Sequence, residues 1–225
     1  MLKDKSRKVE LKVSADGSHT LFVPELDEHY HSVNGAHNES MHVFIEPALK
    51  HCKKQKISIL EIGLGTGLNA FLTAENQGNK SIFYHALEKY PLESSAANRL
   101  NFAKNKEEQQ LFEKLHQLPW NQEEELQSGM TLLKDENDLT SLTFLRKYDL
   151  VYFDAFAPEV QPEMWRESIF RKIYESMNTD GILTTYCAKG VVRRTMQAVG
   201  FTVERLPGPK GKREMLRAIK KNTTA

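Results

Sequence analysis

Hydrophobic and polar positions follow two different spacings along the chain, and segments with one spacing alternate with segments with the other. Short apolar runs rich in β-branched residues are typical of buried strands, and they fall at 57–62, 81–89, 130–135, 148–156 and 181–187. The wider spacing of amphipathic helices predicts helices over 36–52, 68–77, 92–105, 136–147, 162–177 and 190–198. The segment LFEKLHQL is only weakly apolar.

Strands that alternate with helices indicate an α/β fold with a doubly wound, mostly parallel sheet. Hairpin signals lie at both ends of this pattern. Val9, Leu11 and Val13 alternate with polar residues before the turn signal Asp16–Gly17, which predicts a small N-terminal hairpin. FTVERL and EMLRAI, linked by PGPKGKR, predict an antiparallel C-terminal hairpin. We therefore expect an N-terminal hairpin and cap segment over 1–50 and a cofactor-binding domain over 51–225.

In the run ISILEIGLGTGLN, a predicted strand is followed directly by a turn that contains Gly63, Gly65 and Gly67. A dinucleotide fingerprint would need a third glycine where Leu68 stands, and a P-loop would need Lys followed by Ser or Thr after its last glycine. Glu61 belongs to this turn, and its carboxylate would repel a pyrophosphate but attract the cationic groups of S-adenosylmethionine (SAM). The pattern, closed by Asn69, resembles motif I of the class I SAM-dependent methyltransferases, which have a Rossmann-like sheet.

Three carboxylates stand at the ends of predicted strands, where a parallel sheet binds its ligand. Glu88 is placed to accept the ribose hydroxyls, and Asp135 to accept the adenine amino group. Asp154 lies closest to the reacting centre, so it is expected to serve both cofactor binding and chemistry. The alternative for each is a helix N-cap or an ordinary surface carboxylate.

Composition places the chain among ordinary globular proteins. It has 225 residues, a net charge of +1, 27% charged and 40% hydrophobic residues. Cys52 and Cys187 form no Cys-x-x-Cys pair, so neither a disulfide framework nor a zinc site is indicated. The N-terminus lacks a signal-peptide core and no apolar run approaches membrane-span length. We expect a cytoplasmic protein.

Charge is unevenly distributed. From Lys189 onward there are ten Lys and Arg against two Glu. This local excess of positive charge favours an anionic substrate such as nucleic acid. Phosphate contacts are expected from basic residues of this segment, namely Lys189, Arg193, Arg194, Lys210, Lys212 and Arg213. The alternative for each is a solvated surface charge. The four histidines at 29, 31, 37 and 42 lack metal-ligand spacing, so no metal is expected.

At this point a more specific resemblance emerges. Five segments are similar to the methyltransferase domain of the MnmC (DUF752-type) family. They are DAFAPEVQPEMW from Asp154, LEIGLGTGLN, EKYPL from Glu88, the C-terminal GKREML and the N-terminal HYHSVNGAHNESMHVFIE. The resemblance covers about Pro24 to Ile219. It implies SAM-dependent methylation of the aminomethyl group on a modified wobble uridine in the tRNA anticodon region, giving 5-methylaminomethyl-2-thiouridine or its oxygen analogue. Bifunctional members carry an FAD-dependent oxidase domain behind this one, so here we expect a separate oxidase or aminomethyl-forming enzymes to act upstream.

Methyl transfer to an amine depends on positioning a neutral nitrogen. We expect Asp154 to orient the amine and accept its proton, while Phe156, Pro158 and Trp165 exclude water. Glu39 is a second candidate for this pocket, although a charge at a helix N-terminus explains it equally well.

Two other functions stay open. An aminopropyltransferase of the spermidine synthase type shares the fold, but its polycationic substrate calls for an acidic pocket and no basic C-terminus. A non-catalytic tRNA-binding module is the other alternative, and bound SAM would argue against it.

Overall fold

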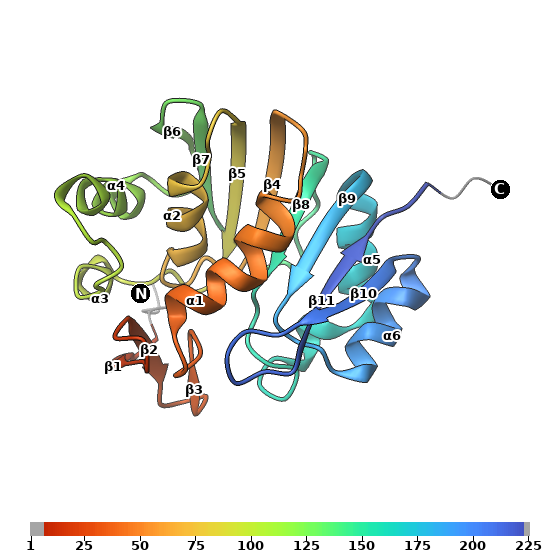
Figure 1. The fold of residues 1–225 in the computed structure, drawn as a ribbon, viewed down its shortest axis with the longest axis horizontal. Helices are drawn as coiled ribbons and strands as arrows, with labels where there is room; N and C mark the ends of the chain where they lie inside the picture. The colour runs from red at the N-terminus through yellow and green to blue at the C-terminus, as the bar shows by residue number, and fades with distance from the viewer. Residues whose placement is uncertain (1–6, 223–225) are drawn as a thin grey trace.

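Two β-sheets of unequal size form the framework of the computed structural model, which describes residues 7–222 (Figure 1). The larger sheet has eight strands in the order β10-β11-β9-β8-β4-β5-β7-β6. Its five central strands run parallel, and they are β4 (Lys56–Ile62), β5 (Ser81–Glu88), β7 (Met130–Glu136), β8 (Tyr148–Phe153) and β9 (Met177–Thr185). Antiparallel strands complete the edges, and they are β6 (Glu123–Gln127), β10 (Thr202–Pro207) and β11 (Glu214–Ile219). The predicted mostly parallel sheet and its antiparallel C-terminal hairpin are confirmed.

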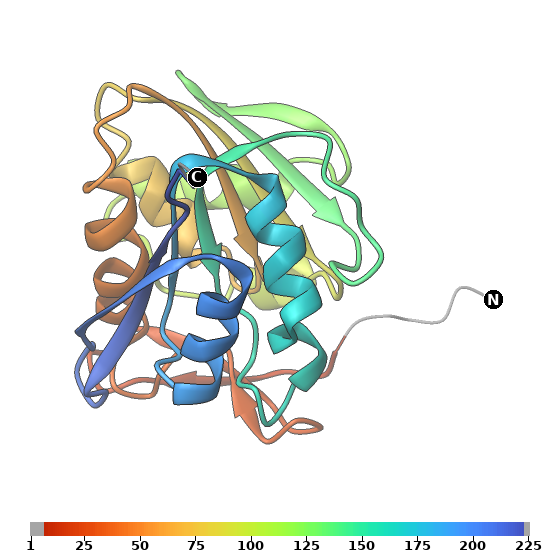
Figure 2. The same cartoon turned by 90° about the vertical axis from the view of Figure 1, so that its right-hand side faces the viewer.

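Helices cover both faces of the large sheet (Figures 1 and 2). One face carries α2 (Leu68–Glu75), α4 (Lys106–Gln117) and a continuous helix made of α1 (Ala36–Ser40) and η1 (Met41–Leu49). The other face carries α5 (Glu167–Ser176), preceded by the short 3₁₀ turn η2 (Pro162–Trp165), and α6 (Gly190–Val199). Each face therefore has its own apolar core, as strands buried on both sides require.

The predicted helix that passes through Pro47 is confirmed, with a π-type winding that the sequence did not indicate. Proline lacks a backbone N–H and cannot donate an ordinary helical hydrogen bond. Around it, the N–H of Lys50 donates to the carbonyl of Ile45, five residues earlier, at 2.9 Å. The wider turn lets the helix continue without a break.

Two predicted helices are wrong. In place of a helix over 92–105 there is only α3 (Ser94–Ala97), and residues 137–147 form an irregular loop. Tertiary contacts fix this loop, because Asp138 pairs with Lys89 and accepts a hydrogen bond from the N–H of Thr140. The strand β6 was missed.

The helix α4 was also missed, although its start carries a local signal. The side chain of Asn105 accepts from the N–H of Glu108 at 2.9 Å, which is the N-cap pattern Asn-x-x-Glu.

The small sheet lies below the carboxyl ends of the parallel strands (Figure 1). It is a three-stranded antiparallel meander of β1 (Glu10–Val13), β2 (His19–Val23) and β3 (Glu28–His29). The predicted N-terminal hairpin is thus present, with one additional strand. A domain division at residue 50 stays a prediction. Within residues 7–222, no helix is long and apolar enough to cross a membrane.

Candidate active site

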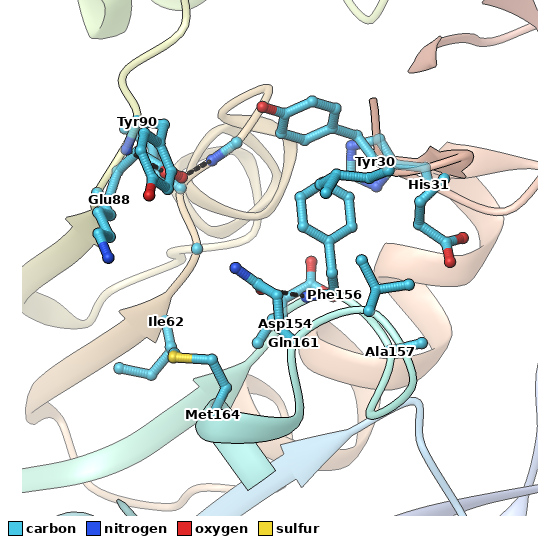
Figure 3. A pocket seen from close by; sticks show the side chains of 18 of the residues that line it. Tyr30, His31, Ile62, Glu88, Tyr90, Asp154, Phe156, Ala157, Gln161 and Met164 are labelled. Carbon is cyan, nitrogen blue, oxygen red and sulfur yellow. Dashed lines mark hydrogen bonds between the residues drawn. The ribbon is translucent and has the colours of Figure 1, made fainter. Parts of the chain in front are cut away.

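A cavity of about 620 Å³ opens at the carboxyl ends of β4, β5 and β8 (Figure 3). Its walls come from the turn after β4, the end of β5, the loops that follow β7 and β8, and the N-terminal segment that precedes η1. The connection between β10 and β11 adds Lys212. This is the edge at which open α/β sheets bind ligands, and the volume suits a small organic molecule.

Glycines shape the turn after β4, although not all of them face the cavity. Gly63 has a φ of 89°, and a Cβ there would lie 2.9 Å from the carbonyl oxygen of Asp154. A Cβ on Gly65 would lie 2.8 Å from the ring of Tyr30. Gly67 packs instead against α4, where a Cβ would lie 3.0 Å from Leu115. The structure therefore brings the first two glycines to the cavity but not Gly67.

Glu88 ends β5 and faces the cavity, as the strand-end argument predicts (Figure 3). One carboxylate oxygen accepts from the N–H of Gly65 at 3.0 Å, and the other from the N–H of Tyr90 at 2.8 Å. Burial raises the pKa of Glu88, while these two hydrogen bonds and Arg7 lower it. Since an ionised carboxylate has about four acceptor positions, two remain for ligand hydroxyls.

Asp154 lies at the end of β8 and lines the cavity from the opposite side (Figure 3). Its Oδ2 accepts from the side-chain amide of Asn69 at 2.8 Å. Burial raises the pKa of Asp154 to about 7, opposed by the Asn69 hydrogen bond and by the charge of Lys212. A carboxyl group with that pKa can take or release a proton near neutrality.

Glu39 and Lys212 meet in the cavity although they are 173 positions apart in the chain. The Lys212 ammonium lies 2.6 Å from one oxygen of Glu39, and the other oxygen accepts from the N–H of Ser32 at 2.9 Å. The same ammonium lies 4.1 Å from the centre of the Tyr186 ring. Tyr186 in turn donates its hydroxyl to the carbonyl of Ala155 at 2.9 Å. Charged and aromatic groups thus converge beside Asp154.

Aromatic side chains form the rest of this wall. The rings of Tyr30 and Phe156 line the cavity with their centres 5.3 Å apart. Trp165 does not reach the cavity, because it is only 6% exposed and its indole N–H donates to the carbonyl of Phe156 at 2.8 Å. Pro158 also stays outside the lining. Trp165 therefore supports the loop that presents Phe156.

Besides Gly67, three residues expected at the cofactor lie away from the cavity. Glu61 is 0% exposed and sits beneath the glycine turn, and Asn69 is almost equally buried. The carboxylate of Asp135 accepts from His85 at 3.0 Å and does not line the cavity. The loop that follows β7 brings Asn137 and Asp138 to the cavity in its place.

Most of the basic residues expected to bind phosphate lie away from the cavity. Lys189 pairs with Glu159 on the surface, and Arg193 donates to Gln197 at 3.4 Å. Arg213 is exposed beside Lys212. Lys212 alone among the predicted basic residues lines the cavity.

Several residues that line the cavity were not predicted as site residues from the sequence. Tyr186 follows β9, so the strand-end rule that indicated Glu88 could have indicated it too. His31 lines the cavity and hydrogen-bonds the Thr66 hydroxyl at 2.5 Å, while burial lowers its pKa to about 4. No local signal marks that contact. Among residues 7–222, no group of three or more His, Cys, Asp or Glu is arranged to hold a metal.

Together, a parallel sheet, a glycine turn and a strand-end carboxylate around a cavity of this size define a nucleotide-cofactor site of the kind that class I methyltransferases have. The profile of a family described as S-adenosyl-L-methionine-dependent methyltransferase matches residues 78–221, and the chain belongs to this family. Its cofactor is therefore SAM. The site fits that cofactor, since Glu88 keeps free acceptor positions and the backbone of Gly63 and Gly65 is open to the cavity.

Curated relatives and solved structures agree with this assignment. The chain is 29% identical over 223 residues to the tRNA 5-methylaminomethyl-2-thiouridine biosynthesis bifunctional protein MnmC of Cupriavidus metallidurans, covering 90% of this chain and 32% of that protein. It is 30% identical to the MnmC protein of Marinomonas sp., covering 85% and 31%. The chain thus spans about a third of the length of these relatives.

Two solved structures share the fold. MnmC2 from Aquifex aeolicus superimposes with a TM-score of 0.76 at 24% identity, over 95% of this chain and 70% of that one. The N-methyltransferase NodS from Bradyrhizobium japonicum reaches a TM-score of 0.50 at 10% identity, over 83% and 94%. Both confirm the architecture.

Proposed function

We propose that this chain transfers a methyl group from SAM to the aminomethyl nitrogen of a modified wobble uridine in tRNA. The product would be 5-methylaminomethyluridine or its 2-thio form. The names of the MnmC relatives support this substrate. The observation that carries the proposal is Asp154, a carboxyl group with a pKa of about 7 at the end of the central strand, beside an aromatic wall.

SAM supplies a methyl group on a positively charged sulfur, which becomes a neutral thioether when the methyl group leaves. An amine that takes up this methyl group would have to present a lone pair and lose one proton. Asp154 accepts this proton and orients the nitrogen. Phe156 and Tyr30 exclude water, which favours the neutral amine because burial penalises its charged form.

The remaining roles divide between the two halves of the cavity. Glu88 accepts the ribose hydroxyls, and Gly63 and Gly65 supply backbone next to the cofactor. The role expected of Asp135 passes to the loop after β7, whose Asn137 and Asp138 line the cavity. Glu39, held by Lys212, borders the space for the substrate amine.

The partners in this proposal are the tRNA and the enzymes that form the aminomethyl group beforehand. A cytoplasmic setting follows from a tRNA substrate. The comparisons do not favour an aminopropyltransferase or a non-catalytic tRNA-binding module.

The test is single-turnover methyl transfer to tRNA that carries 5-aminomethyluridine, with enzyme in excess so that tRNA release cannot limit the rate. Mass spectrometry of the nucleosides should show one added methyl group at the wobble position. The same tRNA with unmodified uridine is the control and should gain none. Methylation of both tRNAs, or of neither, would contradict the proposal.

A further inference from the structure

A cluster of buried polar groups beneath the glycine turn has no role in the mechanism so far. It consists of Glu61 on β4, Tyr84 on β5 and Asn69 on α2, whose exposed fractions are 0%, 0% and 2%. Both carboxyl oxygens of Glu61, the Oδ1 of Asn69 and the hydroxyl of Tyr84 lack a hydrogen-bond partner among the described residues. Unpaired buried polar atoms of this kind destabilise a fold, so four in one cluster need an explanation.

An ionised Glu61 would be hard to accommodate. The charged groups that act on it are Asp154 and Glu88, which are both acidic, and together with burial they raise the pKa of Glu61 well above its usual range. Tyr84 and Asn69 lie close enough to lower this pKa, but neither carries a positive charge. Tyr152, the neighbour of Glu61 across the sheet, is also fully buried and neutral.

A proton on Glu61 gives the unpaired atoms partners. The carboxylic O–H can donate to the Oδ1 of Asn69, and the Tyr84 hydroxyl can donate to the other oxygen of Glu61. The amide of Asn69 is then held at both ends, because its Nδ2 already donates to Asp154 at 2.8 Å. A flipped amide would place two acceptor oxygens, those of Asn69 and Asp154, against each other.

We propose that Glu61 is a neutral hydrogen-bond donor that fixes the Asn69 amide and thereby positions Asp154. Glu61 is a positioning residue that touches neither substrate nor cofactor. The part of this inference that concerns methyl transfer rests on the proposed function, since it takes Asp154 as the proton acceptor. The protonation of Glu61 itself does not depend on that function.

The orientation of Asn69 matters for the chemistry. Its N–H stabilises the ionised form of Asp154 and lowers the pKa of that group, against the effect of burial. Without Glu61 the amide is free to rotate, and Asp154 loses this hydrogen bond. The pKa of Asp154 then rises, so Asp154 is ionised and able to take a proton from the amine only at a higher pH.

Two substitutions at one position separate the neutral from the ionised form. Glu61→Gln keeps a donor and an acceptor in the geometry of a protonated acid, and it should leave SAM affinity and the single-turnover rate within about threefold of wild type. Glu61→Met has similar length without hydrogen bonding. It should keep SAM affinity but move the midpoint of the pH–rate curve upward by about one unit.

Three results would overturn the proposal. Loss of SAM binding in Glu61→Gln beyond about tenfold would mean that an ionised Glu61 holds the cationic part of the cofactor. An unchanged pH midpoint in Glu61→Met would reduce Glu61 to a purely structural role. The third test needs no substrate, so a failed tRNA assay leaves it intact. The infrared difference spectrum of wild type minus Glu61→Gln at pH 7 should show the carbonyl band of a protonated carboxyl, and a carboxylate band in its place would refute the proposal.

Discussion

The two halves of the cavity are built in different ways. The cofactor half comes mainly from the β4–turn–α2–β5 unit, to which the loop after β7 adds Asn137 and Asp138. It relies on backbone atoms and on Glu88, whose partners are backbone N–H groups. The acceptor half is made of side chains from four distant segments, represented by Glu39, Asp154, Tyr186 and Lys212. The first half depends on local sequence, and the second depends on the completed fold.

The carboxylates of the two halves are also held by different kinds of groups. Glu88 is held by fixed backbone dipoles, whereas Asp154 and Glu39 are held by the side chains of Asn69 and Lys212. Side chains can be exchanged one at a time without moving the chain. The acceptor half is therefore where single substitutions should change chemistry, and the cofactor half is where they should change binding and folding.

The largest effect is expected from Asp154→Asn, which keeps the size of the side chain but removes the proton acceptor. Single-turnover methyl transfer should fall by about 100- to 10,000-fold, as for other positioned general bases, while SAM affinity changes far less. Glu167→Gln, an exposed carboxylate on α5 that pairs with Arg171, is the matched control. A wild-type rate in Asp154→Asn would move the chemistry to Glu39 or to desolvation alone.

Next in size is Gly63→Ala in the cofactor half. The added Cβ would lie 2.9 Å from the carbonyl of Asp154 at a φ of 89°. We expect a loss of about 2–4 kcal/mol in unfolding free energy, together with weaker SAM binding in calorimetry. Gly78→Ala is the control, since its φ is 57° with nothing within 4 Å. It should cost about 1–2 kcal/mol and spare SAM binding. Equal losses in both variants would show that strain alone matters.

A smaller effect is expected from Lys212→Met, which removes the positive charge that lowers the pKa of Asp154. Asp154 accepts a proton only when ionised, that is, above its pKa. Raising that pKa should therefore shift the pH–rate curve to higher pH by about one unit and slow transfer about fivefold at pH 7. Lys210→Met, an exposed lysine of the same hairpin turn, should leave the curve in place. A shift in both variants would point to a general surface-charge effect.

The smallest effect tests the basic surface. Arg213 is exposed while its neighbour Lys212 is held by Glu39, so Arg213 is the one of these two residues that is available to contact a tRNA phosphate. Arg213→Gln should make the slope of log affinity against log salt shallower by about one unit, with a modest loss of affinity. Lys212→Met should leave that slope unchanged. The opposite pattern would mean that Lys212 leaves Glu39 when tRNA binds.

The sequence predicted the sheet and the place of Glu88 at the cavity, because both follow from local patterns such as the strand-end position. It misplaced Asp135 and Glu61 for a related reason. Alternate residues of a strand face opposite sides of the sheet, so being one residue from a strand end does not tell which way a side chain points. Asp135 faces His85, and Glu61 faces Asn69 and Tyr84. The pairing of Glu39 with Lys212 joins positions 173 apart, and no local pattern carries it.

That pairing also sets an order of events during synthesis. A ribosome makes the β4–turn–β5 unit well before Lys212, which lies in a hairpin turn where a Cβ on Gly211 would collide with Asn34 of the N-terminal segment. Closing so long a loop carries an entropy cost, which the packing of the strands and helices between the two positions must offset. A nascent chain can thus form the cofactor half before it has an acceptor half. The complete site forms only once the β10–β11 hairpin has folded onto the N-terminal segment.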